Sequence, residues 1–153
     1  MQKRLALLGI IVLLLAGSVA HAQDEVIEMY RSDLRAEKIA IITEEMAFTQ
    51  EEESAFWPVY RKYERELRKI NDARLALITE YGDNYFELDS ATAWRMTKKS
   101  IELDIKMSYL KKEYLWKFER VLPGTKVAKF YQLENLVDLL VRLQIASELP
   151  FVE

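Results

Sequence analysis

The chain has 153 residues, of which 22 are basic and 25 acidic, so its formal net charge is −3. It contains no cysteine, and its one histidine is His21, which argues against thiol nucleophiles, disulfides, and zinc or copper sites. The composition therefore predicts neither an enzyme nor a metal or cofactor site. The net negative charge argues against a nucleic-acid-binding protein.

Residues 1–22 have the pattern of a cleavable secretory signal. Lys3 and Arg4 precede an apolar run over residues 5–15, and Ala20-His21-Ala22 provides a small-x-small cleavage site. The alternative is an uncleaved membrane anchor, but a bilayer-spanning helix needs about 20 apolar residues, and this run is shorter. We predict export, no stable membrane insertion after cleavage, and one domain over residues 23–153, a usual domain length.

Charge is unevenly distributed after residue 22. Residues 23–60 carry a net charge of −7, residues 61–129 carry +5, and residues 130–153 carry −3. Five basic residues stand close together in the basic middle: Arg61, Lys62, Arg65, Arg68 and Lys69. They are either an ordinary solvated face or a binding patch for acidic or unfolded protein segments.

After the signal, the sequence shows helical patterns only, which predicts an all-α, four-helix protein. The first helix is expected over about Val26–Met46. The second begins at Thr49, because Thr49 and Glu52 form a capping box, and it is expected to end at Gly82. Its predicted buried stripe, interrupted at Arg74, consists of Phe56, Tyr60, Tyr63, Leu67, Ile70, Leu77 and Tyr81.

The third helix is expected to start near Asp89 or Ser90 and to end near Val121. Its apolar residues form one stripe through Leu103, Met107, Leu110, Tyr114, Phe118 and Val121, and a second through Trp94, Ile101, Ile105, Leu115 and Leu122. Two apolar stripes predict two packing partners. The fourth helix is expected to have Pro123 in its first turn and to run to about Ser147. Its charges between residues 130 and 146 are Glu134, Asp138 and Arg142 on a single stripe, so most of its circumference should be covered by protein.

Three further features of the sequence bear on shape and function. Pro58 lies nine residues inside the second helix, where it removes a hydrogen bond and should bend the helix. Trp116 lies off the main apolar stripe among basic residues, which makes it a candidate client-binding residue, whereas the aromatic residues Trp94, Tyr109, Tyr114, Phe118, Phe130 and Tyr131 are expected in the core. The run of residues 51–53 is acidic, but consecutive helical side chains diverge, so it predicts neither catalysis nor metal binding.

Two motifs resemble the Spy/CpxP-like family of exported helical proteins, whose helices start at a Leu-Thr-x-x-Gln motif. The first is a threonine cap followed by a Phe-Trp-Pro-Val-Tyr block, and the second is a Leu-Pro-x-x-Lys helix start. The matching residues are Phe48, Thr49, Glu52, Phe56, Trp57, Pro58, Tyr60, Leu122, Pro123 and Lys126. The sequence departs from the motif at Phe48, which replaces leucine, at Glu52, which replaces glutamine, and at Pro123 and Lys126, which stand where a second repeat has threonine and glutamine.

This resemblance implies a thin, curved helical bundle that forms a cradle-like antiparallel homodimer in the periplasm. It also implies an ATP-independent chaperone or envelope-stress protein that binds unfolded or partly folded clients. The alternative is a signalling component that docks on a membrane stress sensor or anti-sigma protein. An amphipathic surface serves either role, so the sequence leaves both open.

Overall fold

The computed structural model describes residues 35–152, and this part of the chain contains helices and no strand. The chain divides into the units Met1–Ala40 and Ile41–Glu153. Of the first unit only residues 35–40 are described, and they are helical. The predicted signal, residues 1–22, and the first nine residues of the predicted helix Val26–Met46 lie outside the described part.

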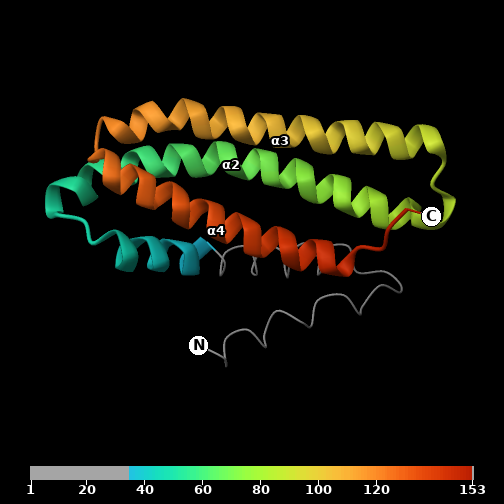
Figure 1. Cartoon of the computed structure of the whole chain (residues 1–153), viewed down its shortest axis with the longest axis horizontal. Coiled ribbons are helices and arrows are strands. Elements are labelled where there is room, and N and C mark those ends of the chain that lie inside the picture. Colours follow the sequence, from blue (N-terminus) through green and yellow to red (C-terminus); the bar gives the residue numbers. More distant parts are fainter. Residues whose placement is uncertain (1–34, 153) are drawn as a thin grey trace, which may run out of the picture. The chain divides into compact units, whose positions relative to one another are not determined.

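The second unit is built from α-helices, as the sequence predicts. Residues 41–46 complete the first described helix, and α2 (Gln50–Asn84), the short 3₁₀ helix η2 (Tyr85–Glu87), α3 (Ser90–Glu119) and α4 (Gly124–Glu148) follow. In Figure 1, α3 runs back alongside α2, and α4 returns obliquely past this pair, starting close to the end of α3.

The predicted helix starts are confirmed at two positions. At α2, the Glu52 amide donates to the Thr49 hydroxyl at 3.2 Å and the Thr49 amide donates to the Glu52 carboxylate at 2.8 Å, which completes the capping box. At α3, the Asp89 carboxylate accepts from the Thr92 amide at 2.7 Å. Pro123 is the residue before the first turn of α4, one position earlier than predicted.

The helix ends differ from the predictions by about two residues. Gly82 does not end α2, because it keeps a helical conformation and the chain continues to Asn84 before tightening into η2. Helix α3 ends at Glu119 rather than near Val121. Pro58 is exposed, and α2 continues through it as one helix.

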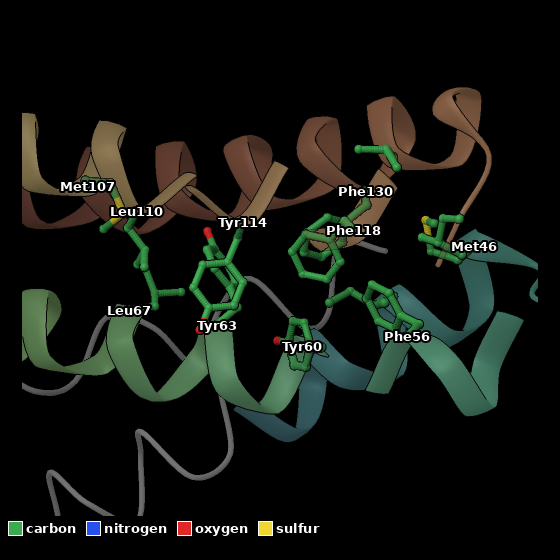
Figure 2. Close-up of a cluster of buried hydrophobic side chains, with 13 residues drawn as sticks. Met46, Phe56, Tyr60, Tyr63, Leu67, Met107, Leu110, Tyr114, Phe118 and Phe130 are labelled. Atoms are coloured by element: carbon green, nitrogen blue, oxygen red, sulfur yellow. The ribbon is translucent and has the colours of Figure 1, made fainter. Parts of the chain in front are cut away.

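Three phenylalanines form the centre of the core. Phe56 of α2, Phe118 of α3 and Phe130 of α4 are each 0% exposed. Their ring centroids lie 4.6 Å apart for Phe118–Phe130, 5.3 Å for Phe56–Phe130 and 5.4 Å for Phe56–Phe118. Figure 2 shows the buried side chains that surround this trio, including Met46, Tyr60, Tyr63, Leu67, Met107, Leu110 and Tyr114.

The first apolar stripe of α3 is buried as predicted except at Val121, which is partly buried, whereas most of the second stripe is exposed. Trp94, Ile101, Ile105 and Leu115 are exposed, and of that stripe Leu122 alone is buried. Tyr109 is 67% exposed, so its assignment to the core, like that of Trp94, is wrong. The second stripe points away from the helices that pack on α3, and no described residue covers it. In α2, Ile70, Leu77 and Tyr81 are only partly buried.

Within the single chain, protein covers only part of α4. Two of the three residues of its charged stripe face inward, because Glu134 is 4% exposed and Asp138 is partly buried, whereas Arg142 is exposed. Apolar residues on other faces of the helix lie exposed: Leu136, Leu139, Leu140, Val141 and Leu143. Partners on α2 and α3 bind the charged stripe, as described below.

We expect Phe118→Ala to lower the free energy of unfolding by about 3–5 kcal/mol, because it leaves a cavity beside Phe56 and Phe130. Trp116→Ala is the matched control, since Trp116 lies on the same helix but is 62% exposed, and its effect should stay within about 0.5 kcal/mol. Chemical denaturation followed by circular dichroism measures both. Equal destabilisation by the two variants would contradict the described core.

Candidate functional site

The two sequence motifs, far apart along the chain, meet in the structure. The Lys126 ammonium donates to the Ala47 carbonyl at 3.0 Å, is hydrogen-bonded to the Glu52 carboxylate, and lies 5.9 Å from the centroid of the Phe48 ring. Ala47 has a positive φ of 44°, an uncommon conformation for a residue with a side chain. We call Ala47, Phe48, Thr49, Glu52 and Lys126 the motif joint.

Glu52 and Lys126, both departures from the family motif, form an ion pair in the joint. Their side chains are 16% and 26% exposed. The hydrogen bond from Lys126 and the bond from the Thr49 amide hold the pKa of the Glu52 carboxyl below its usual value of 4.5. The joint therefore fastens the start of α4 to the start of α2, which is a structural role.

The aromatic block of the first motif belongs mainly to the core. Phe56 and Tyr60 are buried, and Leu122 of the second motif is buried in the same cluster. Trp57 is partly buried, and its indole N–H donates to Glu53 at 3.4 Å. Of the block, Pro58 alone is fully on the surface. The motif residues thus build the fold and do not form an exposed binding site.

A buried tyrosine and a buried carboxylate join α2 to α4. The Tyr63 hydroxyl donates to Glu134 at 3.2 Å, and Tyr63 is 0% exposed. Burial raises the pKa of the Tyr63 hydroxyl, and the nearby negative charge of Glu134 raises it further. Tyr63 therefore remains protonated and keeps donating to Glu134 over the physiological pH range.

Arg74, where the apolar stripe of α2 is interrupted, is the centre of an ionic network. Its side chain is 17% exposed and pairs with Asp104 of α3 and, at 3.8 Å, with Asp138 of α4. Arg142 of α4 pairs with the same two carboxylates, at 3.3 Å and 3.8 Å. The sequence analysis did not predict this network. The signal in the sequence was Arg74 itself, a basic residue within an apolar stripe.

The predicted basic patch lies on α2, opposite the core. Arg61, Lys62, Arg65, Arg68 and Lys69 are all exposed. At 100° per residue they span an arc of the helix centred opposite Phe56, Tyr60, Tyr63 and Leu67. Lys69 pairs with Glu66 at 3.0 Å. We call these five basic residues the basic stripe.

Trp116, the sixth candidate residue, lies on a different helix. It is 62% exposed on α3, opposite that helix's buried stripe. In residues 35–152 no hydrogen bond, ion pair or ring contact joins Trp116 to the basic stripe. The structure therefore brings together the motif residues, but it leaves the candidate client-binding residues on two separate outer faces.

An open groove of about 510 Å³ lies between α2 and α3. Its α2 side is formed by Ala73, Ala76 and Leu77, and its α3 side by Lys98, Lys99 and Glu102. An ion pair between Glu80 and Arg95 crosses from one helix to the other in the groove lining. The groove therefore combines apolar side chains from α2 with mainly charged side chains from α3.

The described residues contain no group of three or more acidic, histidine or cysteine side chains placed to hold a metal ion. The acidic run at the start of α2 diverges, since Glu52 binds Lys126 and Glu53 accepts from Trp57. Within residues 35–152 no helix has the length and apolar character needed to cross a membrane.

No family model, curated protein or solved structure matches the chain.

The lowered pKa of Glu52 gives a pH dependence with a definite sign. Ionised Glu52 stabilises the folded state above pH 4.5, and this gain is lost as the pH falls through the lower folded-state pKa. We expect Glu52→Gln to be less stable than the parent near neutral pH, and the difference to shrink below pH 4.5. Denaturant unfolding at several pH values measures it.

Glu51→Gln is the matched control, because it removes the same charge from the same helical turn at an exposed position. It should lower stability less than Glu52→Gln at neutral pH. Identical effects of the two substitutions across the pH range would show that the Glu52–Lys126 pair does not stabilise the folded state.

Proposed function

We propose that the protein is a periplasmic, ATP-independent chaperone or envelope-stress protein that binds partly folded clients, and that it has no enzymatic activity. The signal pattern and the motif resemblance support export and this class of function. The structural observation that carries the proposal is the basic stripe, five exposed cations on the face of α2 opposite the core.

Exposed apolar side chains provide the second part of a client surface. On α3 the side chains of Trp94, Tyr109 and Trp116 are each more than 60% exposed, and apolar contact of this kind holds an unfolded chain. Charge attraction acts at longer range and speeds encounter, while apolar contact slows dissociation. An acidic, partly folded client is therefore captured through the stripe and retained by apolar contact.

The alternative role is a signalling component that docks on a membrane stress sensor or an anti-sigma protein. Such a partner needs one complementary surface and no general affinity for unfolded chains. Mixing the mature protein with an unrelated aggregating substrate, without ATP, separates the two roles. Suppressed light scattering supports the chaperone, and unchanged aggregation at a molar excess of the protein favours the signalling role.

We expect Arg65→Gln, Arg68→Gln and Lys69→Gln together to slow the capture of an acidic client, as high salt should slow the parent. Exposed substitutions change stability by only about 0.5 kcal/mol each, so the variant should stay folded. Stopped-flow association with an acidic unfolded client measures the rate. The bound lifetime should change less than the association rate.

The matched control removes three exposed cations elsewhere: Lys106→Gln, Lys112→Gln and Arg120→Gln. It lowers the net charge equally, so it should reduce the rate less than the stripe variant if position matters. Equal rates for the stripe variant and the parent at low salt would show that the stripe is only a solvated face.

We also propose a homodimer, and the exposed leucines of α4 support it. Leu136, Leu139, Leu140 and Leu143 are each more than half exposed, and contiguous exposed apolar surface marks interfaces between proteins. A two-fold axis would let this face cover its own copy. The antiparallel, cradle-like arrangement follows from the resemblance alone, whereas a bend of α2 at Pro58 is also expected from the hydrogen bond that proline removes.

Light scattering of the mature protein at micromolar concentration should give twice the monomer mass. Leu139→Lys with Leu143→Lys should shift it to monomer, because charges replace apolar contacts at the interface. Tyr109→Lys with Trp116→Lys, equally exposed positions on α3, should leave the mass unchanged. A stable monomer of the parent protein would refute the dimer.

A further inference from the structure

The C-terminal tail has a defined path, because two tyrosine hydroxyls bind its backbone. Tyr81 near the end of α2 donates to the Pro150 carbonyl at 2.8 Å, and Tyr85 of η2 donates to the Phe151 carbonyl at 3.0 Å. Figure 1 shows the tail leaving α4 and reaching the end of α2. The tail therefore returns to the turn between α2 and α3.

This attachment presents large apolar side chains to solvent. Phe86 is 95% exposed, Phe151 is 93% exposed and Val152 is 58% exposed. The Tyr85 ring lies 5.2 Å from the Phe86 ring and 5.8 Å from the Tyr81 ring, so Tyr85 connects the turn to the tail. We call Tyr81, Tyr85, Phe86, Phe151 and Val152 the turn patch.

The charges around the turn patch are acidic. Residues 75–94 and 143–153 contain no lysine or arginine, whereas Asp83, Glu87, Asp89 and Glu148 stand beside the patch along the chain. Glu80 is paired with Arg95 of α3. The residues around the turn patch thus carry the opposite charge to the basic stripe, which begins at Arg61 of α2.

We propose that the turn patch binds a cationic amphipathic segment of a partner protein. The lysines or arginines of that segment face the acidic residues around the patch, and its apolar side chains pack on Phe86 and Phe151. Acidic surroundings disfavour an anionic membrane surface and an acidic client. The inference goes beyond the proposed function, because the basic stripe selects partners of the opposite charge.

The tyrosine hydrogen bonds make the patch suited to binding. An exposed C-terminal tail ordinarily samples many conformations, and ordering it on binding lowers affinity. Here Tyr81 and Tyr85 hold the Pro150 and Phe151 backbone before a partner arrives. They are positioning residues, which hold the backbone that carries Phe151, and Phe86 and Phe151 provide the contact surface.

The test is fluorescence anisotropy of a labelled peptide of lysine and leucine in helical order, titrated with the full mature chain. A matched peptide with glutamate in place of lysine is the charge control. The acidic peptide should bind the basic stripe, so we expect changes in the turn patch to weaken the cationic peptide and to leave the acidic one within about twofold. Phe86→Ser with Phe151→Ser should weaken binding of the cationic peptide about tenfold or more, since both apolar contacts are lost.

Two further variants distinguish the patch from general apolar binding. Tyr109→Ser with Trp116→Ser removes exposed aromatic rings elsewhere and should change the affinity less than twofold. Tyr81→Phe with Tyr85→Phe keeps the rings but releases the tail, and should weaken binding by less than the serine pair. Circular dichroism should show unchanged helix content in all of them, because the changed groups are on the surface.

The proposal is overturned if the Phe86→Ser, Phe151→Ser variant binds the cationic peptide as well as the parent does, or if these two substitutions weaken binding of the acidic peptide by the same factor. It is also overturned if these substitutions abolish self-association but not peptide binding, because the patch would then serve a second copy of the chain. Aggregation suppression is measured separately, so failure here is distinguishable from failure of the proposed function.

Discussion

The packing of Phe130 against Phe56 and Phe118 fixes the rotation of α4 about its own axis, and the character of the surface follows from that rotation. Residues four apart lie near each other on a helix, so burying Phe130 also turns Glu134 and Asp138 inward, where Tyr63 and Arg74 bind them. The cost is that leucines of α4 face outward. These exposed leucines form the face that the proposed dimer would cover.

The exposed surfaces differ in charge as well as in position. The first part of α2 carries the basic stripe, and the turn after α2, with the returned tail, carries apolar rings among acidic residues. Attraction between charges acts over about 8 Å at physiological ionic strength, so the two regions select partners independently. In the function proposed above, this division would let one chain discriminate between client segments by the sign of their charge.

Local sequence signals predicted the helix starts and the first core stripes, because the Thr49–Glu52 box and the Asp89 cap are interactions within four residues. The same reasoning failed wherever the deciding partner lay on another helix. At least 30 positions separate the partners in the pairs Glu52–Lys126, Tyr63–Glu134 and Arg74–Asp104. Periodicity gives the apolar and charged faces of a helix but not which face turns inward, and for α4 the inward face was the charged one.

The uneven distribution of buried residues has a consequence for local opening. In α4 the buried residues are Val127, Phe130 and Glu134, and no described residue after Glu134 is buried. Backbone amides exchange with solvent through local unfolding, which costs least where few side chains are buried. In a single chain, amide exchange should therefore quicken from Phe130 toward Glu148, while slow exchange throughout α4 would require a second protein surface over its leucines.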